Sequence, residues 1–184
     1  MIRILRYIGL GAFWVVALWM PRLGYAQVAS RDSTRAISAR LFARLGGKWS
    51  CKGGFPRGGV LEADLAFTPG LGGNIVSFEH IDRAPGAYWQ RSTWAVDAKL
   101  PKIVSVGMAG SQKDMSGAAA GFSSTGLSDT SITLQADTLA GPPFATNRFT
   151  YLSRTRDSLE MRWEVLRNAA WSLGDSLVCG RVNR

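Results

Sequence analysis

The stretch Gly47-Lys48-Trp49-Ser50-Cys51-Lys52-Gly53 stands where the sequence changes from a helical to an extended pattern. Its cysteine has one possible partner within the chain. The only other cysteine is Cys179, in Leu177-Val178-Cys179-Gly180-Arg181 near the C-terminus. In an oxidising compartment, two such thiols favour a structural disulfide. The bond would join the first extended segment to the last.

The first residues have the pattern of a secretory signal peptide. Arg3 and Arg6 precede an apolar run of thirteen residues from Ile8 to Met20, and Gly24-Tyr25-Ala26 supplies the small residues of a cleavage site. The run is short for a membrane-spanning helix of ~20 residues, so an uncleaved anchor is the second interpretation. We predict cleavage after Ala26 and a periplasmic or secreted protein with no stable membrane insertion after cleavage.

The remaining chain has the length of one domain. We divide the sequence into a signal peptide (1–26), an N-terminal helical segment (27–46) and a β-barrel domain (47–184). The whole chain has 22 Lys and Arg against 13 Asp and Glu, a formal net charge of +9. Removal of the signal peptide removes three arginines and no acid, which leaves +6. The basic residues are spread along the chain, so we predict a solvated basic surface and no nucleic-acid partner.

The segment before Gly47 predicts one amphipathic helix. Asp32 or Ser33 is the predicted N-terminal cap, and Gly46 and Gly47 are predicted to end the helix in a left-handed conformation. Apolar residues at helical spacing predict a face that packs on the rest of the domain. This face consists of Ile37, Leu41, Phe42 and Leu45.

From Gly47 onward, apolar and polar residues alternate with a period of two, which predicts β-strands. The segment from Gly107 to Gly126 is rich in Gly, Ala and Ser, and we interpret it as a mobile loop with a short strand around Phe122. In total we expect nine or ten short strands after a single helix. This pattern predicts an all-β antiparallel fold, either a sandwich or an up-and-down barrel. The clearest strands are 61–67, 74–82, 88–96, 102–108, 131–135, 148–153, 159–167 and 177–182.

The two cysteines favour the barrel. In an up-and-down barrel the first and last strands are neighbours, since closure removes both sheet edges. Cys51 and Cys179 could then face each other within the roughly 7 Å between Cα atoms that a disulfide needs. The bond would enclose most of the domain, for which the chain-entropy model gives an upper figure of about 5 kcal/mol. A sandwich could also bring the two cysteines together, although closure explains their positions more directly.

The segment from Gly47 to Gly53 resembles known motifs. Gly47-Lys48-Trp49 is similar to the Gly-x-Trp that opens the first strand of lipocalins and related calycins. The longer segment is similar to the Gly-x-Trp-x-Gly-x-Gly of nitrobindin-like barrels, with Cys51 at a position that is usually glycine. The ending from Trp171 to Arg181, with Pro85 and Tyr88, resembles uncharacterised secreted bacterial proteins related to these barrels.

This resemblance implies a calycin-like barrel in which Trp49 closes one end beneath an arginine from near the C-terminus. Arg181 is the matching arginine, with Arg184 as the second choice. In nitrobindins a histidine late in the chain holds haem, whereas this sequence has no histidine after His80. We therefore expect no haem and no other cofactor.

Few residues in the sequence suggest catalysis. His80 and Asp82 share a strand face and could form a polar pair at the mouth of a barrel, although such a histidine is more often a hydrogen-bonded strand residue. Glu62 and Asp64 also share a face, about 7 Å apart, but they alternate with apolar residues and are predicted to face solvent. We assign no catalytic residue and no metal ligand.

The aromatic residues are the stronger indication of function. Phe78, His80, Tyr88 and Trp94 have the parity of one inner face, so they could line a lumen or form ordinary core. We expect an exported barrel that binds a small hydrophobic or amphipathic ligand without catalysis. The alternative is a solid structural or interaction module of the bacterial envelope. An enzyme that uses His80 and Asp82 is a third hypothesis. Any protein partner is unknown.

Overall fold

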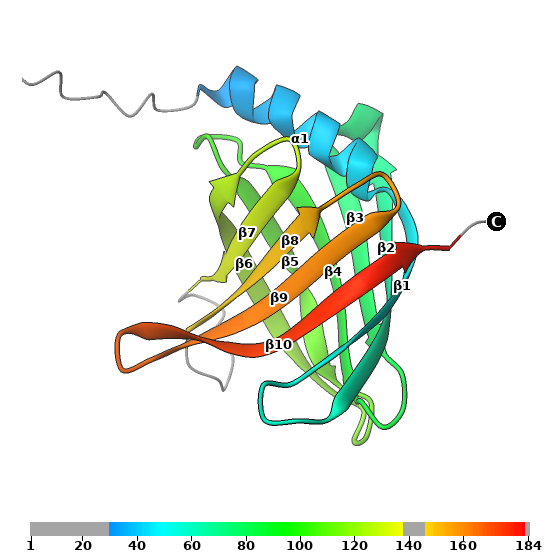
Figure 1. Cartoon of the computed structure of the whole chain (residues 1–184). Helices are drawn as coiled ribbons and strands as arrows, with labels where there is room; N and C mark the ends of the chain where they lie inside the picture. The colour runs from blue at the N-terminus through cyan, green and yellow to red at the C-terminus, as the bar shows by residue number, and fades with distance from the viewer. Residues whose placement is uncertain (1–29, 138–145, 183–184) are drawn as a thin grey trace, which may run out of the picture.

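The strands form one closed antiparallel barrel. The computed structural model describes residues 30–137 and 146–182, and the predicted signal peptide and Arg184 lie outside them. Each strand pairs with its neighbours in the sequence, and β1 also pairs with β10, which closes the sheet (Figure 1). The strands are β1 (Gly47–Gly54), β2 (Val60–Gly70), β3 (Ile75–Asp82), β4 (Tyr88–Val96), β5 (Ile103–Ser111), β6 (Ser116–Leu127), β7 (Ser131–Ala136), β8 (Asn147–Ser153), β9 (Ser158–Arg167) and β10 (Ala170–Arg181).

This architecture confirms the predicted antiparallel barrel with one N-terminal helix and fixes the number of strands at ten. Cys51 of β1 lies opposite Cys179 of β10, and the two form a buried disulfide with Cα atoms 3.9 Å apart. The predicted bond is therefore present at the seam of the barrel. It is compatible with an exported protein. Within the described ranges, no helix is long and apolar enough to cross a bilayer.

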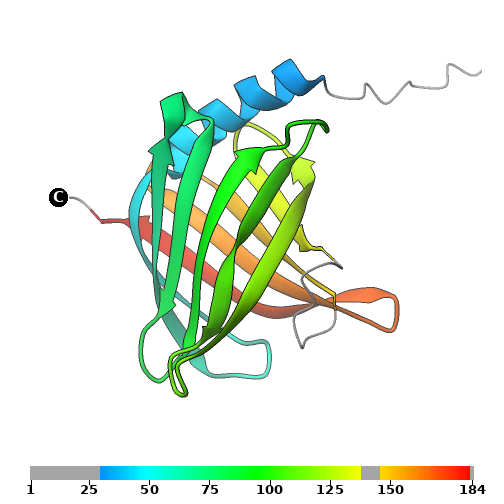
Figure 2. The ribbon, with the colours of Figure 1, turned by 180° about the vertical axis from the view of Figure 1, so that it is seen from behind.

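Helix α1 (Arg31–Leu45) lies across one end of the barrel, as two opposite views show (Figures 1 and 2). Its cap is Ser30, whose side chain accepts a hydrogen bond from the backbone N–H of Ser33, so the predicted caps were wrong. Gly46, with φ −51° and ψ 133°, is not left-handed, whereas Gly47 after it has a positive φ of 120°. The helix buries Leu41, Phe42 and Leu45 against the barrel, whereas Ile37 of the predicted face is only half-buried.

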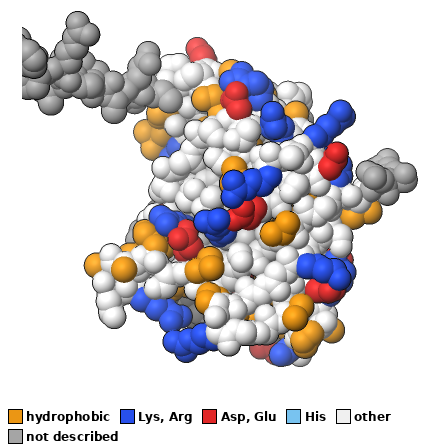
Figure 3. Space-filling view, viewed as in Figure 1, with side chains coloured by type: hydrophobic (Ala, Val, Ile, Leu, Met, Phe, Trp, Pro, Cys, Tyr) orange, Lys and Arg blue, Asp and Glu red, His pale blue; other side chains and the backbone are white. Residues whose placement is uncertain are grey.

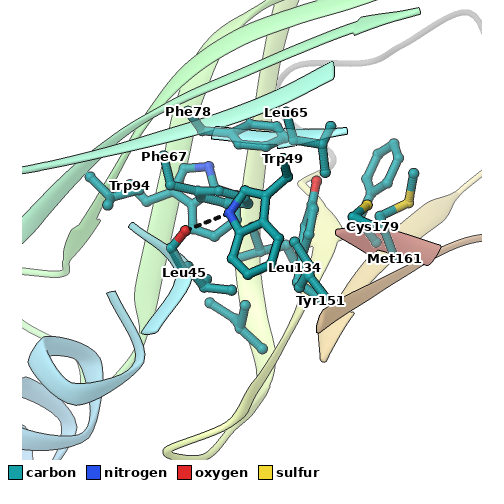
Figure 4. Packing of buried hydrophobic residues seen from close by; sticks show 14 of the residues in the cluster. Leu45, Trp49, Leu65, Phe67, Phe78, Trp94, Leu134, Tyr151, Met161 and Cys179 are labelled. Atoms are coloured by element: carbon teal, nitrogen blue, oxygen red, sulfur yellow. Dashed lines mark hydrogen bonds between the residues drawn. The ribbon is translucent and has the colours of Figure 1, made fainter. Parts of the chain in front are cut away.

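Aromatic rings fill the half of the barrel next to α1. Phe67, Phe78, Trp94 and Tyr151 contact one another with ring centroids 4.8 to 5.9 Å apart, in tilted or edge-on arrangements (Figure 4). Such arrangements are the favoured ones for aromatic pairs. The indole Nε1 of Trp49 donates to the carbonyl oxygen of Leu45, 2.8 Å away. Side chains therefore fill this half of the lumen.

The segment from Gly107 to Gly126 was predicted as a loop with a short strand around Phe122. The strand is confirmed, but the loop was wrong, because most of the segment belongs to β5 and β6. Its small residues fit close approaches between strands. A Cβ at Gly107 would lie 2.0 Å from the carbonyl oxygen of Arg91, and a Cβ at Gly117 would lie 2.7 Å from the ring of Trp89. Gly, Ala and Ser produce no visible apolar alternation, so the pattern that reveals the other strands is missing here.

The disulfide makes a testable contribution to stability. Replacing both Cys51 and Cys179 by Ala is expected to lower the free energy of unfolding by about 2–5 kcal/mol, because the unfolded chain loses its constraint. The barrel still folds, since the β1–β10 hydrogen bonds remain. Denaturant unfolding of both proteins, with and without reductant, measures the effect. Equal midpoints for the oxidised wild type and the double variant would contradict it.

Candidate ligand-binding site

A cavity of about 600 Å³ occupies the half of the barrel away from α1. It is bounded by the last residues of β3 and β5 and the first residues of β4 and β6, with walls from β8, β9 and β10. Apolar and small side chains dominate the wall. Its residues are Phe55, Leu61, His80, Asp82, Ala87, Tyr88, Ala109, Gly110, Ser111, Ser116, Gly117, Ala118, Ala119, Ala120, Gly121, Phe122, Ala136, Asn147, Phe149, Met161, Trp163 and Asp175.

The four residues predicted to line a lumen divide between the two halves of the barrel. His80 and Tyr88 lie in the cavity wall. Phe78 and Trp94 are buried in the aromatic cluster next to α1 and do not reach the cavity. Strand parity places all four on the inner face, but parity does not tell which half of a strand borders empty space. Only His80 and Tyr88 of the four predicted residues therefore line the cavity.

His80 and Asp82 form a buried pair at the end of β3. His80 Nε2 lies 3.0 Å from Asp82 Oδ1, and His80 is 2% exposed. The other carboxylate oxygen, Asp82 Oδ2, accepts a hydrogen bond from the backbone N–H of Tyr88, also 3.0 Å away. The Tyr88 ring stands edge-on to the imidazole, with centroids 5.1 Å apart. Both oxygens of Asp82 thus hold neighbouring parts of the protein in place.

The turn between β3 and β4 keeps Asp82 in this position. A Cβ at Gly86 would lie 2.8 Å from the Asp82 Cβ, so the turn can pack this closely only with glycine there. On the outer surface, Arg83 donates to Ser50 Oγ at 2.6 Å and to Asp64 Oδ1 at 3.0 Å. The guanidinium group therefore fastens the turn to β1 and β2.

Two polar residues of the wall were missed from the sequence. The last strand was predicted to start at Leu177, but β10 starts at Ala170 and carries Asp175 into the wall. A change of register between Leu173 and Asp175 leaves Gly174 as an extra residue, packed against the Trp163 ring. A bulge of this kind redirects the side chains beside it. Asn147, at the start of β8, continues the inward alternation of Phe149 and could have been found by extending that strand.

Asp175 has an unusual environment for a carboxyl group. Its Oδ1 is buried and has no hydrogen-bond partner among the described residues. Burial, with a further contribution from the negative charge of Asp82, raises the pKa of Asp175 from 3.8 to about 7. Burial also raises the pKa of Tyr88, again with the charge of Asp82 as a second cause. The polar side of the cavity is therefore a place where negative charge is unfavourable unless something compensates it.

At the other end of the barrel, Arg181 covers Trp49. The guanidinium carbon lies 4.1 Å from the centroid of the indole, in cation–π contact. The guanidinium nitrogens also donate to the carbonyl oxygens of Arg44, Gly46 and Arg156. These contacts join the end of α1 to the end of β10, so the end next to the helix is closed by hydrogen bonds as well as by packing.

Glu62 and Asp64 lie outside the barrel, on the face opposite to the cavity. Glu62 is 3.1 Å from Lys52 Nζ, and the hydrogen bond from this lysine lowers the pKa of Glu62. Asp64 pairs with Arg83. No group of three or more His, Cys, Asp or Glu that could hold a metal ion occurs within 30–137 and 146–182.

Comparison with solved structures finds the same kind of fold in Rv2717c from M. tuberculosis, determined by crystallography. The match covers 79% of this chain and 98% of that chain, with a TM-score of 0.51 and 15% sequence identity. At this identity the likeness shows the fold alone. No protein-family model matches the sequence, and no curated protein matches it. What the site does must therefore be argued from its geometry.

The raised pKa of Asp175 predicts how stability depends on pH. Because the folded protein keeps this carboxyl protonated up to about pH 7 while the unfolded chain releases its proton near 3.8, the free energy of unfolding should fall between these pH values. Asp175→Asn should raise the free energy of unfolding at pH 8 by about 1–3 kcal/mol and leave it nearly unchanged at pH 4. Denaturant unfolding across this range tests the prediction. A gain that is equal at both pH values would refute it.

Proposed function

We propose that this protein binds a small hydrophobic or amphipathic ligand in its cavity. The cavity itself is the observation that carries the proposal. Its volume of about 600 Å³ lies within the 300–1,000 Å³ typical of small-molecule sites. Its wall also has the usual composition of such sites, mostly apolar with a few polar groups to orient the ligand. Binding would remove apolar surface of both partners from water.

The cavity favours this function over a solid structural module. A module that acts only through its outer surface gains nothing from an unfilled half, and empty space lowers stability because the side chains around it lose packing contacts. The aromatic cluster next to α1 supports the same view, since the chain can fill its lumen with rings where stability alone matters. We propose that the second half is kept open for a ligand.

We propose a binding function without catalysis and without a cofactor. Of the residue pairs considered from the sequence, only His80 and Asp82 lie in the described cavity wall, and the contacts of Asp82 favour a positioning role. One carboxylate oxygen holds His80 and the other holds the backbone of Tyr88. The pair thus fixes the shape of the wall. The signal-like N-terminus and the disulfide support action in the periplasm or outside the cell.

An uncharged apolar dye tests the binding function. Nile red should bind the wild-type protein with a rise in its fluorescence, because its emission increases when it leaves water for an apolar site. Ala120→Phe should weaken this binding at least tenfold, because Ala120 shares the inner face of β6 with buried Phe122 and the new ring would fill the cavity.

The matched control is Val106→Phe, which places the same ring on an exposed position of the neighbouring strand, outside the cavity wall. This variant should bind Nile red as the wild type does. Thermal unfolding of both variants shows whether the barrel is intact. If neither wild type nor control binds the dye, or if both variants lose binding equally while folded, the proposed function fails.

A further inference from the structure

The cavity wall and the outer surface differ in charge. The chain has 22 Lys and Arg, yet none of them is among the described residues that line the cavity. On the face of the molecule seen in Figure 3, Lys and Arg side chains are scattered over the outer surface and interspersed with acidic ones. The wall instead contains two carboxyl groups, Asp82 and Asp175. Although the protein as a whole is basic, a ligand in the cavity would therefore meet acidic side chains.

The two carboxyl groups are not equivalent. Asp82 uses one oxygen for His80 and the other for the backbone N–H of Tyr88. Asp175 has a buried Oδ1 with no partner in the part of the chain that the structure describes. A buried acceptor that gives up water without a new hydrogen bond loses free energy. Asp175 is thus the carboxyl group that still needs a donor.

A second residue supports this conclusion independently. Asn147 is 5% exposed, lies in the cavity wall and comes from β8, a different strand from Asp175. Its Oδ1 also has no hydrogen-bond partner among the described residues. Buried side-chain polar atoms in folded proteins nearly always have a partner. With His80 Nδ1, three residues of one apolar cavity wall carry buried polar atoms without a partner among the described residues. This shortage of partners points to a bound group that forms hydrogen bonds.

We infer that the ligand is an amphipathic amine, with an ammonium head that donates to Asp175 and an apolar body that fills the rest of the cavity. This inference rests on the proposed function and names its ligand class. An ammonium group offers up to three N–H donors and a positive charge, so it can satisfy an acceptor and compensate a buried carboxylate together. A carboxylate or phosphate head would meet two acids and no Lys or Arg among the lining residues.

The charge of Asp175 makes the binding of an amine depend on pH. Its raised pKa, about 7, means that the carboxyl is largely neutral at pH 5.5 and largely charged at pH 8. Amine affinity should therefore increase over this range, as Asp175 becomes able to pair with the ammonium group. The other titratable groups of the wall are His80, Asp82 and Tyr88, and the charge of Asp175 also acts on buried Tyr151. A variant at Asp175 is needed to assign the pH effect to this residue.

Three ligands of similar size and shape separate charge from apolar contact. They are 4-phenylbutylamine, 4-phenylbutanol and 4-phenylbutyrate, which are cationic, neutral and anionic at pH 8. Displacement of Nile red from the wild-type protein measures their affinities, with calorimetry as the direct check. We expect the amine to bind at least tenfold more tightly than the alcohol at pH 8, and the carboxylate to bind more weakly than the alcohol. The preference for the amine should shrink severalfold at pH 5.5.

Asp175→Asn tests the residue itself. It should abolish the preference for the amine and its pH dependence. The affinity for the alcohol should change far less, because its neutral hydroxyl can donate to the amide oxygen of Asn and its apolar contacts are unchanged. The matched control is Asp129→Asn, which removes one acid from the exposed ion pair with Arg40 at the α1 end of the barrel. This control should keep the full preference for the amine.

The results distinguish the inference from the function on which it rests. If Nile red binds but the amine binds no better than the alcohol at pH 8, the amine inference is wrong and ligand binding stands. If the preference survives Asp175→Asn, the assignment of the ammonium site to Asp175 is wrong. If neither the dye nor any of the three ligands binds, both the inference and the proposed function are wrong.

Discussion

The pairing of β1 with β10 organises the whole barrel. It converts a ten-stranded meander into a barrel without free edges, so each strand is hydrogen-bonded to a neighbour on both sides. The Cys51–Cys179 bond lies within this seam, and Arg181 at its end ties β10 to the last carbonyls of α1. One pairing thus closes the sheet, seats the helix and gives the lumen a fixed circumference.

Within that circumference, the size of the side chains decides which half is filled. Near α1, rings from four different strands meet and leave no large space. In the other half, β5 and β6 contribute Gly, Ala and Ser, and a cavity remains although β8 and β9 contribute the larger Phe149, Met161 and Trp163. A barrel of this size has a lumen that side chains can fill or that can hold one small ligand. This chain combines both solutions along one axis, with a packed half for stability and an open half for binding.

The polar groups of the open half come from strand ends and one irregularity. His80 and Asp82 end β3, Tyr88 begins β4, and Asp175 enters the wall beside the bulge at Gly174. Strand ends can place a polar group inside a barrel without interrupting the packed core, because they lie beyond it. Asp82 is used to shape the wall, whereas Asp175 retains unsatisfied hydrogen-bonding capacity. The same cavity therefore provides an apolar volume and two carboxyl groups, of which Asp175 has an oxygen without a partner among the described residues.

The pattern of residues along the chain was enough to predict the class of fold. Alternation of apolar and polar residues is a local pattern, so it revealed most strands and placed Phe78, His80, Tyr88 and Trp94 on the inner face of the barrel. The two cysteines then predicted that the first and last strands are neighbours. Alternation failed in β5 and β6, where small residues hide it, and at the start of β10, where the bulge interrupts it. The cavity, and the positions of Asp175 and Asn147 in its wall, became evident only from the three-dimensional arrangement of the strands. The volume of a cavity is the space inside the barrel that side chains leave unfilled. It depends on the size of a lumen formed by ten strands and on the side chains that all of them contribute, so no local sequence pattern can predict it.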